Sequence, residues 1–151
     1  MRVLFLCVGN SARSQMAEAL LEHRGGDAFE VESAGTNATA LNPLTVTVLS
    51  EIGIDWSGAR SKPLTDFLGQ PFDLVVTVCD EAQEACPIFP GATRQIHWSF
   101  RDPAAVEGPE ERRRAAFRTV RDEIDAAIGR RKFLAEADEA PVHRGLATRP
   151  A

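Results

Sequence analysis

The sequence of 151 residues lacks tyrosine, has only three histidines and shows no excess of basic residues. Its 17 Lys and Arg residues stand against 22 Asp and Glu residues, which gives a formal net charge of −5 at pH 7. A chain without a basic excess is poorly suited to a phosphate backbone, so we expect no nucleic acid partner. No apolar run approaches the ~20 residues of a membrane span, so we expect no membrane association.

Cysteine is also scarce. The sequence has three cysteines, Cys7, Cys79 and Cys86, and an odd number cannot all pair. The first residues are basic and then apolar, like a signal peptide, but polar residues from Asn10 onward end the apolar run too early. We therefore expect a cytoplasmic chain, in which cysteines serve chemistry more often than structure.

Strand and helix patterns alternate along the chain. Apolar and β-branched runs predict strands over residues 2–6, 29–33, 72–78 and 94–100. Apolar residues at helical spacing predict helices over residues 14–22, 42–53 and 109–131, and a short helix is expected over 80–85. Asn42-Pro43 is expected to start the second of these helices, with Val46, Leu49 and Ile52 on its inner face. The last helix is expected to bury a stripe made of Phe117, Val120, Ile124, Ala127 and Ile128. This order predicts an α/β fold with an open four-stranded parallel sheet and helices on both faces. We expect one catalytic domain over residues 1–135 and a loosely ordered tail over 136–151.

The strongest candidate site follows the first predicted strand. In such a sheet the binding crevice lies at the carboxyl ends of the strands, where Cys7 and Cys79 both fall. Backbone N–H groups at a helix N-terminus bind anions, and Arg13 can fork onto two oxygens of a tetrahedral oxyanion. The same positive surroundings favour a nucleophilic thiolate at Cys7. We therefore predict a nucleophile at Cys7 followed by an anion-binding loop made of Val8, Gly9, Asn10, Ser11, Ala12, Arg13 and Ser14.

A family resemblance extends this prediction. Residues 7–18, CVGNSARSQMAE, resemble the low-molecular-weight tyrosine phosphatases and, more closely, the arsenate reductases built on the same fold. In both groups the general acid is the aspartate of an Asp-Pro pair late in the chain, which implies that role for Asp102. Phosphatases of this type usually have a tyrosine directly after that pair, to hold an aromatic substrate. Here the residue is Ala104.

The other two cysteines indicate the branch of the family. The segment 75–87 resembles the redox segment of thioredoxin-coupled arsenate reductases, in which two cysteines stand seven apart before a proline. Residues seven apart on a helix are separated by about 10 Å along its axis, at 1.5 Å per residue. A disulfide needs Cα atoms within about 7 Å. Cys79 and Cys86 can therefore join only if the segment between them unwinds.

The resemblance, which covers roughly residues 2–130, implies an arsenate reductase for arsenic detoxification. Its thiol/disulfide relay would pass from Cys7 to Cys79 and then to Cys86. Arsenate would be the substrate, with phosphate or sulfate as analogues, and thioredoxin or a similar external thiol would be the reductant, with no bound cofactor. Two alternatives remain open: a cysteine-dependent phosphatase acting on phosphomonoesters, and a non-catalytic anion-binding or redox-sensing module.

Members of this family often bind potassium near the anion loop. Asn10, Glu18 and Ser33 match residues that help to hold the ion, but Lys62 stands where a second acidic ligand is expected. Its ammonium group can take the place of the cation and pair with Glu18, so we expect no potassium requirement. The alternative is that Glu18 and Lys62 are simply exposed charges. The histidines lack metal-ligand spacing, so no metal site is predicted.

Overall fold

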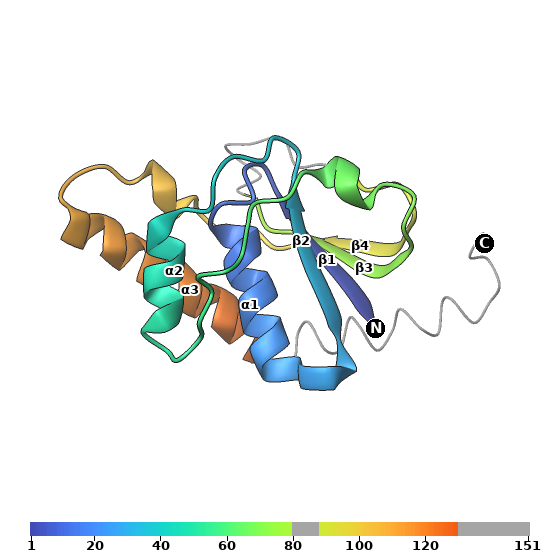
Figure 1. Ribbon diagram of the computed structural model, residues 1–151, viewed down its shortest axis with the longest axis horizontal. Helices are drawn as coiled ribbons and strands as arrows, with labels where there is room; N and C mark the ends of the chain where they lie inside the picture. Colours follow the sequence, from blue (N-terminus) through green and yellow to red (C-terminus); the bar gives the residue numbers. More distant parts are fainter. Residues whose placement is uncertain (80–87, 130–151) are drawn as a thin grey trace.

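The computed structural model describes residues 1–79 and 88–129, and its strands form one parallel sheet (Figure 1). The strand order is β2-β1-β3-β4. The strands are β1 (Arg2–Cys7), β2 (Glu30–Gly35), β3 (Phe72–Thr77) and β4 (Ala92–His97). The described α-helices are α1 (Arg13–Gly25), α2 (Pro43–Ser50) and α3 (Glu110–Gly129), and the short 3₁₀ helices are η1 (Gly26–Ala28), η2 (Leu64–Phe67) and η3 (Pro103–Ala105). The predicted open parallel sheet is confirmed.

Some predictions lie outside the described residues. The short helix expected over 80–85, the residue Cys86 and the tail expected over 136–151 all fall in the segments 80–87 and 130–151. The proposed end of the catalytic domain at residue 135 also falls there. These expectations remain predictions.

The sheet is buried on both faces because its two central strands are apolar almost throughout. In β1, Val3 and Phe5 face one side, and Leu4 and Leu6 face the other, and each is fully buried. Continuous apolar runs of this kind are typical of parallel strands covered on both sides. Each fully buried side chain of this size stabilises the fold by roughly 1.5–3 kcal/mol.

The three α-helices lie on one side of the sheet (Figure 1), and their apolar faces join Val3 and Phe5 in one core. The other face is covered by η2 and by edge-to-face contacts among three aromatic rings. Phe72 packs against Phe67 at 6.0 Å and against Phe89 at 5.5 Å between ring centroids. The segment between α2 and β3 therefore runs from the helical side of the sheet to its opposite face.

Helix α3 packs as its sequence predicts. The expected apolar stripe is buried throughout and consists of Phe117, Val120, Ile124, Ala127 and Ile128. Helix α2 differs, because it ends at Ser50 rather than near residue 53 and leaves Ile52 41% exposed. Its buried apolar residues are Leu44, Val48 and Leu49. The predicted inner face of Val46, Leu49 and Ile52 was therefore right only for Leu49.

Strand β4 begins and ends earlier than the predicted 94–100. The Trp98 N–H still donates to the Thr77 carbonyl at 2.8 Å, but Thr77 is the last residue of β3. Beyond that point the Phe100 carbonyl accepts a hydrogen bond from Arg13 at 3.2 Å instead. The chain therefore leaves the sheet at its carboxyl edge and turns towards the start of α1.

That edge brings the candidate residues together. The Val78 N–H donates to the Leu6 carbonyl at 2.9 Å, which places Cys7 and Cys79 just beyond paired positions of adjacent strands. The segment that leaves β4 then carries Asp102 to the same edge. No helix within the described residues is long and apolar enough to cross a bilayer.

Candidate active site

The Cys7 sulfur lies at the junction of β1 and the anion loop and is held on two sides. The side-chain oxygen of Ser14 lies 2.8 Å from it, and the backbone N–H of Asn10 donates to it at 3.3 Å. The residue is only 2% exposed. The loop thus folds around its own nucleophile, and two of the loop's polar groups contact the sulfur.

Asn10 fixes the conformation of this loop. Its φ of 49° lies in the left-handed region, which asparagine tolerates better than most residues. Its Nδ2 donates to the hydroxyls of Ser14 at 2.8 Å and Ser33 at 2.9 Å. Its Oδ1 accepts from the Lys62 backbone at 2.8 Å and from Gln15 Nε2 at 3.0 Å. Both donors and both lone pairs are thus used, so the side chain has a single satisfied orientation.

Gly35, at the end of β2, gives the loop the space it needs. A Cβ atom there would collide with the Val8 carbonyl oxygen and would lie 2.9 Å from the Asn10 nitrogen. The backbone of β2 can approach the anion loop only because residue 35 has no side chain.

Arg13 and Asp102 form the opposite wall. Arg13 is buried at the start of α1, and its guanidinium donates to the Phe100 carbonyl and lies 3.8 Å from Asp102 Oδ2. Asp102 Oδ1 accepts the Ala104 N–H at 3.0 Å, which makes Asp102 the N-cap of η3. The Asp102 side chain is 37% exposed, so it lies in contact with solvent.

A pocket of about 300 Å³ opens between the anion loop and Asp102. Its described lining residues are Cys7, Val8, Gly9, Ser11, Ala12, Arg13, Asn37, Thr39 and Asp102. None of them is aromatic. Asn10 and Ser14, which the sequence grouped with the anion-binding residues, lie fully buried beneath the loop and support Cys7. Asn37 and Thr39 were missed, although they follow the carboxyl end of a parallel strand, where ligand-binding residues gather.

A buried ion pair lies behind the loop. Lys62 Nζ is 3.2 Å from Glu18 Oε1, which also accepts a hydrogen bond from the Ser33 hydroxyl at 2.5 Å. Burial raises the pKa of Glu18 above its ordinary value, and the Lys62 ammonium offsets part of that rise. These are not exposed charges, since the side chains of Lys62 and Glu18 are 14% and 9% exposed. The Lys62 ammonium therefore lies beside Glu18, where the sequence placed it as a partner for that carboxylate.

Cys79 is fully buried two residues after the end of β3, and its thiol lies 3.9 Å from the Leu6 carbonyl oxygen. Leu6 immediately precedes Cys7. The structure therefore brings Cys7, Cys79, Arg13 and Asp102 to one edge of the sheet, whereas Cys86 lies outside the described residues.

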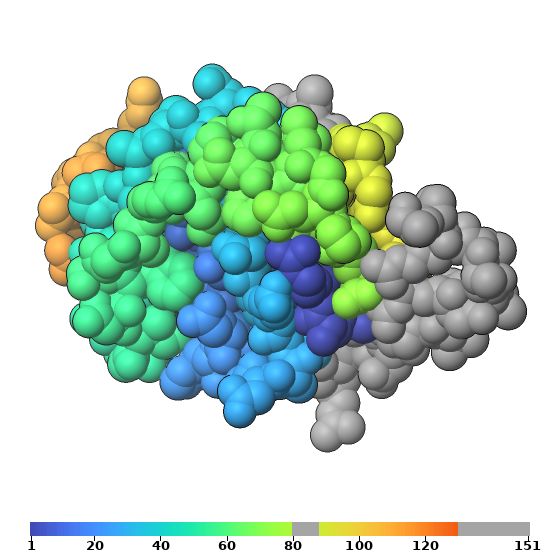
Figure 2. Space-filling model, turned by 45° about the vertical axis from the view of Figure 1, so that its right-hand side comes forward, coloured from blue at the N-terminus to red at the C-terminus, as the bar shows by residue number. Residues whose placement is uncertain are grey.

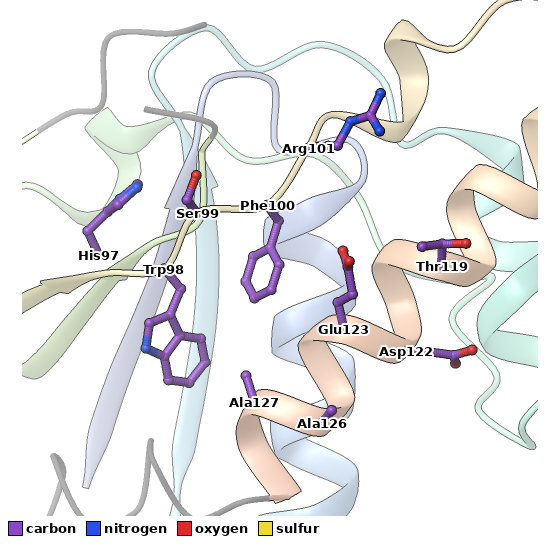
Figure 3. A pocket seen from close by; sticks show the side chains of 10 residues that line it. All are labelled: His97, Trp98, Ser99, Phe100, Arg101, Thr119, Asp122, Glu123, Ala126 and Ala127. Carbon is purple, nitrogen blue, oxygen red and sulfur yellow. The ribbon is translucent and has the colours of Figure 1, made fainter. Parts of the chain in front are cut away.

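A second pocket, of about 720 Å³, lies between α3 and the segment that leaves β4 (Figure 3). The Phe100 ring and the Glu123 side chain project into it, and the Trp98 and Phe100 rings meet edge to face at 6.4 Å. It is larger than the loop pocket, but no thiol lines it. Among the described residues, no group of three His, Cys, Asp or Glu side chains could hold a metal ion.

The nucleophile, the helix N-terminus and Arg13 converge on a space that suits a small tetrahedral anion. This arrangement puts the protein in the class of cysteine-dependent enzymes that act on such oxyanions.

Comparison with known proteins narrows the class. Residues 2–140 match the family described as "Low molecular weight phosphotyrosine protein phosphatase". The chain is 47% identical over 126 residues to an arsenate reductase of Halalkalibacterium halodurans, covering 83% of this chain and 91% of that one. It is 45% identical over 122 residues to an arsenate reductase of Bacillus subtilis, covering 81% and 88%. The chain belongs to the low molecular weight phosphotyrosine protein phosphatase family and, within it, to the arsenate reductases.

Solved structures of related proteins support the same assignment. An arsenate reductase in the phosphate-binding state superposes with a TM-score of 0.72 at 27% identity, covering 90% of this chain and 98% of that one. A thioredoxin-dependent arsenate reductase of Corynebacterium glutamicum gives 0.66 at 34% identity, with 92% and 62% covered. An arginine phosphatase of Geobacillus stearothermophilus gives 0.64 at 27% identity, with 91% and 96% covered. The fold is thus shared by reductases and phosphatases, and the expected phosphatase-like architecture is confirmed.

Proposed function

We propose that this protein reduces arsenate to arsenite through a relay of three cysteines, a reaction that serves arsenic detoxification. The observation that supports it most is the buried Cys79 thiol, 3.9 Å from the carbonyl of the residue before Cys7. A hydrolytic phosphatase needs one thiolate, whereas a reductase needs a second thiol to supply the other electron of a disulfide. Cys79 lies at the same edge of the sheet as Cys7, which supports that role for its thiol.

In the first step the Cys7 thiolate attacks the arsenic of arsenate held by the loop and Arg13. A sulfur–arsenic bond forms and one arsenic–oxygen bond breaks. Asp102, in its protonated form, donates a proton to the departing oxygen, which leaves as water. Its position beside Arg13 and its partial exposure support this role, because the acid must be reprotonated by solvent in each cycle.

In the second step the Cys79 thiolate attacks the Cys7 sulfur. A disulfide forms, the sulfur–arsenic bond breaks, and its electron pair stays with arsenic, which leaves as arsenite. Cys86 then attacks Cys79, which frees Cys7 as a thiolate and moves the disulfide to the 79–86 pair. An external dithiol of the thioredoxin type reduces that pair and is itself oxidised, so the protein needs no bound cofactor.

Hydrolysis of phosphomonoesters is the second candidate function. Asp102 favours it, because a general acid serves a phosphate leaving group as well as it serves arsenate. The described pocket lining offers no aromatic side chain against which an aryl group could stack. We therefore propose that this activity is weak and secondary.

The buried Lys62–Glu18 pair supports catalysis without potassium, because the ammonium already neutralises Glu18 behind the loop. Phosphate should bind equally well in potassium and in choline salts. Tighter binding in potassium salts would contradict this proposal. A relay that starts from reduced thiols also supports a cytoplasmic location, where thiols are kept reduced.

The decisive assay is arsenate-dependent NADPH consumption with thioredoxin and thioredoxin reductase, run beside the same assay with glutaredoxin and glutathione. We expect turnover with the first pair. Cys86→Ser should complete one turnover only and trap a Cys7–Cys79 disulfide, visible by mass spectrometry of its peptides. Multiple turnover by Cys86→Ser with thioredoxin would remove the role of Cys86.

A further inference from the structure

The segment between α2 and β3 contacts the anion loop through residues that do not line the loop pocket. In the space-filling view this green segment forms a continuous surface beside the light blue atoms near residue 30 (Figure 2). The Ser61 hydroxyl lies 3.0 Å from the Gly9 carbonyl and 2.7 Å from the Asn10 carbonyl. The backbone N–H of Lys62 donates to Asn10 Oδ1. Residues 56–62 thus contact the part of the anion loop that contains Asn10, the residue with a left-handed backbone conformation.

Gln15 connects this segment to Asn10 through a side-chain amide that is fully buried. Its Nε2 donates to Asn10 Oδ1 at 3.0 Å, lies 3.2 Å from the Asn10 carbonyl, and donates to the Arg60 carbonyl at 2.9 Å. Its Oε1 accepts the indole N–H of Trp56 at 2.8 Å. All the groups around Nε2 are acceptors, so the amide works in one orientation only.

The indole N–H of Trp56 requires the same orientation of the Gln15 amide. An indole nitrogen is a donor and never an acceptor, so it can pair with Oε1 but not with the NH₂ group of Gln15. If the amide turned over, Oε1 would face the oxygens of Asn10 and the NH₂ group would face the indole N–H. Both contacts would be repulsive, and buried polar groups would lose their partners.

We propose that Trp56 is a positioning residue for the anion loop. Its indole N–H orients Gln15, Gln15 orients the Asn10 side chain, and Asn10 holds the loop in the conformation that supports Cys7 and receives the oxyanion. The proposal deepens the proposed function and rests only on its first element, that the loop binds a tetrahedral anion.

The first test is phosphate binding, measured by isothermal titration calorimetry. Trp56→Phe keeps an aromatic six-membered ring and removes the N–H donor together with the rest of the five-membered ring. It should weaken phosphate binding about fivefold or more, the size expected for one lost buried hydrogen bond. Ser57→Ala is the matched control, because Ser57 lies in the same segment and, among the described residues, its hydroxyl donates only to Asp55, at 2.7 Å. Ser57→Ala should bind phosphate like the parent, and equal binding by Trp56→Phe would overturn the proposal.

A double-mutant cycle separates positioning from a general loss of packing. Gln15→Met removes the amide, after which the indole has nothing to orient. Adding Trp56→Phe to Gln15→Met should change phosphate affinity less than about twofold, whereas independent packing effects would add. Additive losses would contradict the relay from Trp56 through Gln15.

Tryptophan fluorescence gives a signature that packing alone would not produce. The sequence has two tryptophans, so Trp98→Phe leaves Trp56 as the only indole. Saturating phosphate should shift or quench its emission, because the indole is linked to the loop through a single side chain. An unchanged spectrum would overturn the proposal even if Trp56→Phe failed to fold. These readouts use phosphate, so they stand whether or not the protein reduces arsenate.

Discussion

The two halves of the active site are built differently. In the loop half, Asn10, Ser14 and Gln15 are fully buried, and their polar groups bond to one another and to the segment 56–62. In the acid half, the Asp102 side chain is 37% exposed, accepts the Ala104 N–H and has an arginine 3.8 Å away. The nucleophile is held tightly, whereas the acid is held at the edge of solvent.

The difference follows from what each half must do. A nucleophile and its anion must meet within a few tenths of an ångström, which favours a fully satisfied buried network. A general acid must release a proton and regain it in each cycle, which favours contact with water. Changes in the loop half should therefore abolish chemistry, whereas changes in the acid half should slow it and leave binding intact.

The largest effect should come from Cys7→Ser, which removes the nucleophile itself. Arsenate reduction and aryl phosphate hydrolysis should both fall below detection, measured by coupled NADPH consumption and by release of an aryl alcohol. Cys79→Ser is the matched control, since it should lose reduction but keep slow hydrolysis. If Cys79→Ser kept full reductase turnover, a thiol other than Cys79 would have to resolve the first intermediate.

A smaller effect should come from Asp102→Asn. The kcat for aryl phosphate hydrolysis should fall by ~10²–10⁴, the usual contribution of general acid catalysis. Phosphate affinity should not weaken, because the loop half remains intact and a carboxylate near the anion is removed. A variant with an unchanged kcat would show that the acid is elsewhere.

A third prediction concerns the Lys62–Glu18 ion pair, which lies behind the anion loop. Lys62→Met should lower the free energy of unfolding at pH 8, by less than the ~3–5 kcal/mol of a fully broken buried pair because Glu18 can take up a proton. Burial already raises the pKa of Glu18 above its ordinary value of 4.5, and loss of the ammonium raises it further. Above pH 4.5 the unfolded chain releases this proton before the folded chain does, so stability falls as the pH rises through the folded-state pKa.

The stability deficit of Lys62→Met should therefore be smaller at pH 4.5 than at pH 8. Urea unfolding of both proteins at the two pH values measures it. A deficit that is equal at both values would mean that Glu18 does not carry the effect.

Much of the fold could be predicted because its signals are local. The apolar stripe of α3 follows from helical spacing alone, and the start of α2 follows from Asn42-Pro43. The Asn42 side chain does accept the Leu44 N–H at 2.9 Å, as an N-cap should. The anion loop was equally local, since its cysteine, glycine, arginine and serine are contiguous in the chain.

What could not be predicted depends on contacts between distant residues. Trp56 donates a hydrogen bond to Gln15, which lies 41 positions earlier in the sequence. In the sequence both looked like ordinary residues of a turn and a helix. The end of β4 depends on where β3 stops and on Arg13, 87 positions before Phe100. Likewise, only the tertiary structure shows that Asn37 and Thr39 reach the pocket rim.

The smallest effect should come from Thr39→Ala, at that rim. Thr39 is exposed, and its hydroxyl reaches the Gly9 carbonyl only at 3.5 Å, too long for a strong hydrogen bond. Its backbone N–H, which the substitution keeps, already donates to the same carbonyl at 3.0 Å. Phosphate affinity should thus change less than about twofold, since one weak exposed hydrogen bond contributes little. A tenfold loss in calorimetry would instead assign the Thr39 hydroxyl to the bound anion and extend the loop half of the site to the segment after β2.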